Sequence, residues 1–268
     1  MKSKLKALAA AVALAAVAGQ ASANIQQPAI GTPGEVVFWA FGQDSTGSFA
    51  TYVKDLGVTY DAFVSSPSYA AVDLGTDANW NSFMGNAALV GNKTWGVTAT
   101  ATQGGTGLNS RKILTTFNND SFGTGTTNGP MTTAYGNFGI STSAINAFDG
   151  TPNATNNSYY FDLTTNGLDR NLGWRLNNDY GTSGVFPNTG NIIGTTTNAN
   201  FYQVIKTSAT SGLAATISDI DAGTDYWTLS GNNLSYGAIP AVPEPETYGM
   251  LAAGLLMLGA VARRRRQQ

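Results

Sequence analysis

The sequence predicts an all-β fold, either an antiparallel β-sandwich or an open barrel with Gly- and Asn-rich loops, followed by a single C-terminal transmembrane helix. Three observations favour this class. Apolar residues between positions 24 and 242 occur in short runs or alternate with polar residues, as they do in strands. Gly, Asn, Asp and Ser separate these runs and are typical of turns. No apolar pattern of helical period extends over about ten residues before the C-terminal tail.

The N-terminus has the three regions of a secretory signal peptide. A start with three lysines is followed by an apolar stretch over residues 7–18 and then by small residues. The residues that mark the cleavage site are Ala21, Ala23 and Asn24. We therefore expect a signal peptide over residues 1–23 and an extracellular or periplasmic β domain over residues 24–240.

Composition excludes several classes of function. Residues 24–242 contain 14 acidic and 7 basic side chains, a net charge of −7, so nucleic acid is not an expected partner. The chain has neither histidine nor cysteine, which excludes a Ser-His-Asp triad, a thiol nucleophile and a zinc site of the ordinary type. No disulfide can form, so stability must come from burial and hydrogen bonds.

The first two strands are predicted as a hairpin, in which an apolar run is followed by a turn and a second strand. Residues 36–41 (VVFWAF) predict a buried strand and residues 42–47 (GQDSTG) a hairpin turn. Residues 48–57 (SFATYVKDLG) then predict a second strand, with Phe49 and Val53 among its inward residues.

Two short helical turns are predicted next. They cover residues 59–64 and 77–85, with Thr59 and Thr76 as the N-caps.

Residues 93–102 (KTWGVTATAT) alternate with period two. One face carries Trp95, Val97, Ala99 and Ala101, and the other carries Thr94, Thr98, Thr100 and Thr102. The threonine row has two interpretations. It is either the outward polar face of an ordinary amphipathic strand or part of a regular ice-binding array, which would need several such strands.

Further strands are predicted at residues 111–117, 158–165, 173–178, 191–197, 201–208 and 214–220. A final hairpin pairs residues 225–230 with residues 233–237 around Gly231 and Asn232. Residues 141–148 predict a single helical turn.

The C-terminal tail combines an apolar run with a basic end. Residues 247–262 carry no charge, and 16 helical residues span roughly 24 Å, short of the roughly 30 Å bilayer core. Arginine side chains can extend the span by snorkelling, and their excess marks the cytoplasmic side. The basic residues are Arg263, Arg264, Arg265 and Arg266. We expect a transmembrane helix with the β domain outside.

The tail over residues 241–268 resembles the PEP-CTERM sorting domain, also known as the ice-binding protein C-terminal domain. Pro243, Glu244 and Pro245 match its signature, and the apolar run and Arg cluster follow in the required order. The resemblance implies transient anchoring in the inner membrane, recognition by an exosortase and removal of the tail. Delivery to the surface or extracellular matrix of a Gram-negative bacterium that makes exopolysaccharide or biofilm would follow.

Candidate sites within the domain are few. Asp219, Asp221 and Asp225 surround Gly223 in a spacing that resembles a calcium loop, although solvated turns have the same composition. For an enzyme, the remaining option is a pair of carboxylates, with Glu35 the only glutamate of the domain. The aromatic residues that would stack on sugars, if exposed, are Trp174, Tyr180 and Trp227.

We expect an exported surface or matrix protein with a structural or polysaccharide- and biofilm-associated binding role. We assign no catalytic residue and no required cofactor. The expected partners are exosortase, the membrane before processing, and exopolysaccharide. The alternatives are a secreted carbohydrate-active enzyme and a calcium-stabilised adhesin.

Overall fold

The computed structural model describes residues 25–29, 32–102, 111–117, 127–147, 157–162, 191–194, 198–220 and 224–238. The chain divides into two compact units, Met1–Gly237 and Ala238–Gln268, and the fold below is that of the first. The predicted transmembrane helix lies outside the described residues. Within the described ranges, no helix is both long and apolar enough to cross a membrane.

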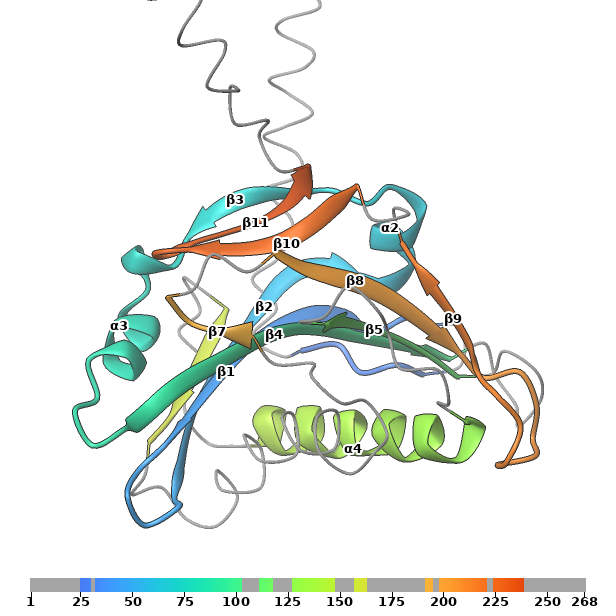
Figure 1. Cartoon of the computed structure of the whole chain (residues 1–268), viewed down its shortest axis with the longest axis horizontal. Helices are drawn as coiled ribbons and strands as arrows, with labels where there is room; N and C mark the ends of the chain where they lie inside the picture. Colours follow the sequence, from blue (N-terminus) through green and yellow to red (C-terminus); the bar gives the residue numbers. More distant parts are fainter. Residues whose placement is uncertain are drawn as a thin grey trace, which may run out of the picture. The chain divides into compact units, whose positions relative to one another are not determined.

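The first unit is built on one antiparallel sheet of eleven strands. The strands are β1 (Glu35–Gln43), β2 (Phe49–Thr59), β3 (Tyr69–Asp73), β4 (Val90–Thr102), β5 (Arg111–Phe117), β6 (Ser158–Phe161), β7 (Asn191–Ile192), β8 (Asn198–Ile205), β9 (Thr216–Asp219), β10 (Asp225–Ser230) and β11 (Asn233–Ala238). Their order is β3-β11-β10-β8-β5-β4-β1-β2-β6, with β7 beside β4 and β9 beside β8. The sheet curls into a half-barrel (Figure 1), which confirms the all-β prediction and favours its open-barrel form.

The β1–β2 hairpin forms as the sequence predicts. The carboxylate of Asp44 accepts hydrogen bonds from the backbone N–H groups of Thr46 and Ser48, each at 2.8 Å, and so stabilises the turn. Gly47 has a φ of +82°, which glycine adopts without steric cost. Phe49 and Val53 are buried on β2, as predicted.

Two hydrophobic cores lie on opposite faces of the sheet. The inner core fills the concave face and includes Phe38, Tyr52, Trp80, Trp95 and Trp227. The outer core lies under helix α4 (Asn128–Ala147) and includes Val37, Trp39, Val53, Phe138 and Ile145. Because alternate residues of β1 enter different cores, the whole run of residues 36–41 is buried, which explains its continuous apolar sequence.

The period-two alternation of β4 is confirmed, but the interpretation of the threonine row as an outward polar face is wrong for Thr98 and Thr100. Thr98 and Thr100 are 0% exposed, because their face of the sheet is covered by the outer core. Thr98 accepts a hydrogen bond from the indole N–H of Trp39 (3.1 Å). Gly96 leaves room for that indole, since a Cβ there would lie 2.4 Å from a ring carbon. These threonines therefore cannot form an ice-binding plane.

The 20-residue helix α4 (Asn128–Ala147) was not predicted; only a helical turn at residues 141–148 was. Figure 1 shows it running along the sheet on the side away from β10 and β11. Its buried stripe consists of Met131, Ala134, Phe138, Thr142 and Ile145, spaced three, four, four and three residues apart. The threonine in this stripe and the three glycines of the helix make the helical pattern of apolar residues hard to recognise in the sequence. The buried hydroxyl of Thr142 donates a hydrogen bond to the Phe138 carbonyl (3.0 Å).

The two short predicted helices are present. Helix α2 (Tyr60–Ser65) begins after Thr59, which caps it as predicted. Helix α3 (Ala78–Met84) is capped by Asp77, so the prediction of Thr76 is wrong: Thr76 ends a 3₁₀ turn, η1 (Leu74–Thr76). The carboxylate of Asp77 accepts the backbone N–H of Asn79, two residues later in the chain (2.9 Å). Asp77 therefore takes the N-cap position that the sequence predicts for Thr76.

Strand β5 and the β10–β11 hairpin lie where predicted, and β9 lies within its predicted range. Strand β8 begins and ends three residues earlier than predicted, β6 and β7 are confirmed only over Ser158–Phe161 and Asn191–Ile192, and β3 was not predicted. The predicted residues 163–165, 173–178 and 195–197 lie outside the described ranges.

Candidate functional site

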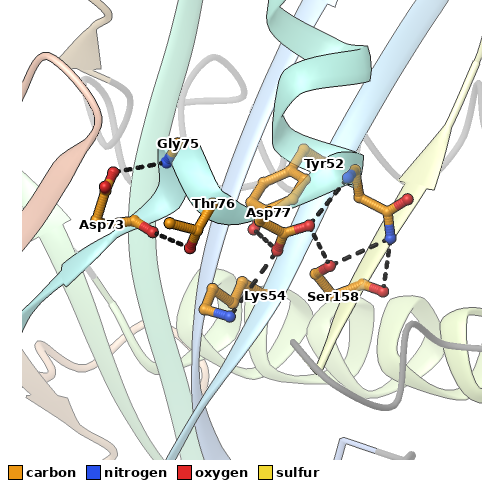
Figure 2. Close-up of polar contacts among 8 residues, drawn as sticks. Tyr52, Lys54, Asp73, Gly75, Thr76, Asp77 and Ser158 are labelled. Carbon is orange, nitrogen blue, oxygen red and sulfur yellow. Dashed lines mark hydrogen bonds and ion pairs between the residues drawn. The ribbon is translucent and has the colours of Figure 1, made fainter.

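The polar side chains buried inside the inner core converge on Asp77 (Figure 2). One carboxylate oxygen accepts hydrogen bonds from Ser158 Oγ (3.0 Å) and from the Asn79 N–H (2.9 Å). The other accepts one from the hydroxyl of Tyr52 (2.8 Å) and lies 3.9 Å from the ammonium of Lys54. Strands β2 and β6 and the start of α3 are thus joined through one side chain.

Burial shapes the titration of this cluster. Lys54 is 9% exposed and Asp77 2%. Burial lowers the pKa of Lys54, and the nearby carboxylates of Asp77 and Asp55 oppose that shift. The pKa of Tyr52 is raised far above its ordinary value by burial and by the charge of Asp77, so its hydroxyl stays a hydrogen-bond donor. The cluster therefore holds a charge pair in place and offers no open face to a ligand.

A second buried group is the carboxyl pair of Glu35 and Asp55, which lies on the outer-core face of β1 and β2. The two side chains lie close enough for each to shift the pKa of the other, and the residues are 6% and 5% exposed. Burial raises the pKa of Glu35, and burial together with the charge of Glu35 raises the pKa of Asp55 to about 7. In the sequence, Glu35 stands out only as the one glutamate of the domain, because its partner on the neighbouring strand cannot be identified without the strand register.

The predicted calcium ligands are only partly described. Asp219 ends β9 and Asp225 begins β10, while Asp221 lies outside the described residues. The part of the chain that the structure describes contains no group of three or more Asp, Glu, His or Cys side chains that could hold a metal. The calcium site stays a prediction.

The candidate sugar-stacking residues divide in the same way. Trp227 is 0% exposed and packs against four aromatic rings of the inner core, so it is a core residue. Trp174 and Tyr180 lie outside the described ranges.

Both ends that carry the sorting signals also lie outside the described residues. They include the cleavage-site residues Ala21, Ala23 and Asn24, the motif Pro243, Glu244 and Pro245, and the cluster Arg263, Arg264, Arg265 and Arg266.

Comparison with protein families decides the nature of the tail, because the model of the PEP-CTERM protein-sorting motif matches residues 241–266. The chain carries a PEP-CTERM motif. Comparison with curated proteins gave no match, and neither did comparison with solved structures. The PEP-CTERM motif thus provides the assignment of destination, and the β domain has no matched relative to lend it an activity.

The PEP-CTERM motif indicates export, transient anchoring in the membrane and processing by an exosortase, followed by location at the cell surface or in the extracellular space. The described domain ends at Ala238 in β11, only a few residues before the matched segment. Exosortase is accordingly the processing partner of this protein.

Changing the PEP-CTERM signature is expected to abolish release. In the triple variant Pro243→Ala, Glu244→Ala, Pro245→Ala, we expect at least a tenfold drop in the extracellular fraction, because these residues are the signature of the motif that directs the chain to exosortase. Intact mass in the membrane and extracellular fractions gives the readout, and the membrane form should retain Arg263–Arg266. The control Gln267→Ala, Gln268→Ala changes residues beyond the cluster. Release of the triple variant with a wild-type C-terminus would contradict the assignment.

Proposed function

We propose that the β domain is a structural component of the surface or extracellular matrix of a Gram-negative bacterium, and that it contacts exopolysaccharide of a biofilm. The observation that carries this proposal is the PEP-CTERM motif placed directly after the last strand of the sheet. A protein sorted in this way is delivered into a polysaccharide-rich layer, and its folded part is what remains there.

The charge distribution supports contact through uncharged groups. Asp61 and Asp73 are the charged side chains that are exposed among the described residues, whereas Glu35, Lys54, Asp55, Asp77 and Lys206 are buried. Exposed asparagines such as Asn81, Asn198 and Asn233 present hydrogen-bonding groups instead. Binding to a neutral polysaccharide through such groups is weakly sensitive to salt.

The exposed apolar side chains also support contact through hydrogen-bonding groups. The large apolar side chains exposed on the described part of the molecule are Val90, Ile140, Ile192 and Leu213, all of them aliphatic. We therefore propose hydrogen bonding as the main contact that the described part of the domain makes with sugar.

We also propose that the role is not catalytic. Glycosidases place two carboxyl groups roughly 5 to 9 Å apart on either side of an accessible bond. Glu35 and Asp55 are instead both buried, and their carboxyl groups lie close enough to shift each other's pKa. This arrangement leaves no room for a sugar between them.

Co-sedimentation of the processed protein with exopolysaccharide from its own host tests this function. We expect the protein to pellet with the polymer, to remain bound at 0.5 M salt within about twofold, and to leave the polymer length and reducing ends unchanged. New reducing ends would establish the carbohydrate-active alternative. Failure to pellet at any salt concentration would remove the polysaccharide contact.

A further inference from the structure

We propose that the carboxyl pair of Glu35 and Asp55 is a proton-operated latch: it holds the N-terminal segment, residues 25–27, against the domain in acidic surroundings and loosens it as the pH rises to neutral. This inference concerns a device within the fold and does not depend on what the domain binds. It makes the exported domain responsive to the pH outside the cell.

The first step is the geometry of the pair. Asp55 lies opposite Val37 in the β1–β2 ladder, and a register shift between Glu35 and Val37 accommodates the glutamate at the strand end. Asp55 Oδ1 accepts the N–H of Gly57 (2.7 Å). Oδ2 is buried and receives no hydrogen bond from the described N–H and O–H groups. The contact with Glu35 is therefore stabilising only when one of the two carboxyl groups carries a proton and donates it.

The second step connects the pair to the N-terminal segment. Glu35 Oε2 accepts the backbone N–H of Gln26, and the N–H of Glu35 donates to the Gln26 carbonyl (3.1 Å). Ile25 is buried in the outer core. The side-chain amide of Asn146 on α4 both donates to the Ile25 carbonyl (2.8 Å) and accepts its N–H (2.9 Å). The segment thus joins Glu35 to α4.

The third step is the charge environment. Lys54 lies on the opposite face of β2, beside Asp77, and its charge lowers the pKa of Asp55, but the effect of burial is larger. Tyr159 of β6 and Tyr69 of β3 are the other ionisable groups coupled to the pair, and both are neutral phenols whose pKa is raised, that of Tyr69 to about 12.

The remaining neighbours add no compensating charge. Helix α4 has one ionisable side chain, Tyr135, and it lies against Arg111 at the far end of β5. Thr100 of β4, whose carbonyl accepts the Gly34 N–H beside Glu35, is neutral, and its buried hydroxyl has no described partner. When the shared proton leaves, a second negative charge remains in a buried site, and Lys54 offsets it only in part, since the pKa of Asp55 stays raised in spite of that lysine. Opening of the segment admits water and relieves it.

The sign of the pH dependence follows from linkage. In the closed state the pKa of Asp55 is about 7, whereas an aspartate in water has a pKa of about 3.9. Between these values the closed state holds a proton that the opened state has lost, so the opening equilibrium increases by up to tenfold per pH unit. Below about pH 4 and above about pH 7 the opening equilibrium does not change with pH. The latch is tightest in acid.

Amide hydrogen exchange of the processed protein tests the latch, with Asp55→Asn as the variant. Asparagine keeps the acceptor for Gly57 and supplies a permanent donor to Glu35, so this variant should stay closed at every pH. We expect the exchange rates at Gln26 and Glu35, wild type over variant, to be near one at pH 4.5 and to rise at least tenfold by pH 7. The rate at Leu234, in the inner core, should differ little.

Two further variants make the outcome decisive. Asp61→Asn removes an exposed carboxylate and should keep the wild-type profile. Glu35→Gln keeps the acceptor for Gln26, donates to Asp55 and should also abolish the rise, which covers the case in which Asp55→Asn does not fold. A wild-type profile without the rise, or a rise that persists in Glu35→Gln, would overturn the proposal.

Discussion

Replacing Asp77 with alanine is expected to lower the free energy of unfolding by about 3–5 kcal/mol. The change removes the N-cap of α3 and the acceptor for Tyr52 and Ser158, and it leaves Lys54 buried beside no partner from α3. Denaturant unfolding at a single fixed pH measures this loss. The pH must be constant because the carboxyl groups of Glu35 and Asp55, on the opposite face of β2, have raised pKa values, so their protonation also changes stability with pH.

Asp73 provides a matched control for this substitution, since it also caps a short helical turn (Figure 2). It is exposed, and its carboxylate serves only the Gly75 N–H (2.8 Å), so Asp73→Ala should cost about 1 kcal/mol or less. Asp77→Asn should fall between the two, because an amide keeps the cap oxygen but not the charge. Equal losses for Asp77→Ala and Asp73→Ala would show that the buried network contributes nothing beyond capping.

Replacing Trp227 with alanine is expected to cost about 3–5 kcal/mol as well. Its indole packs between the rings of Phe63, Phe201 and Tyr236, with centroids 5.8, 5.8 and 5.3 Å away. These rings come from α2, β8 and β11, so the cavity would open in the inner core beside helix α2 and the β3-β11-β10-β8 end of the sheet. Thermal or denaturant unfolding gives the measurement.

A conservative variant separates packing from recognition at this position. The indole N–H of Trp227 has no described hydrogen-bond partner, so Trp227→Phe removes an unsatisfied donor along with one ring and should cost less than half of the alanine loss. Polysaccharide co-sedimentation of Trp227→Phe should match the wild type. Loss of binding with unchanged stability would return Trp227 to the role of a sugar-stacking residue.

The strands were predictable because burial follows the local pattern. In β1 and β4 the apolar run and the strict alternation are direct consequences of which faces are covered. The error at Thr98 and Thr100 has the opposite origin. Threonine is compatible with either face of a sheet, and only the presence of α4 over that face decides that these residues are buried.

Helix α4 itself was hidden because tertiary packing overrides its composition. Glycine and threonine are poor helix formers, so a sequence with Gly129, Gly136 and Gly139 gives little local signal. The stripe that includes Met131 and Phe138 becomes informative only when Thr142 is read as a buried member of it. A prediction based on apolar residues alone misses that reading.

The sorting motif and the buried polar groups differ in how well they can be predicted from the sequence. The sorting motif is contiguous, so Pro243 to Pro245 and the residues after them identify it without a structure. The buried groups are assembled across strands. The partners Lys54 and Asp77 are joined by the return of the chain into α3, and Glu35 meets Asp55 only through the hairpin register.

The pairing of β3 with β11 determines when the domain can finish folding during export. Asp73 faces Asn233 across this ladder, although most of the chain separates them in sequence. Leu234 and Tyr236 of β11 also close the inner core. A chain that crosses the membrane N-terminus first, as the predicted signal peptide implies, cannot complete the domain before β11 has crossed. The final strand would then dock only when translocation is nearly finished, and pairing over so long a sequence separation makes folding slow for a domain of this size.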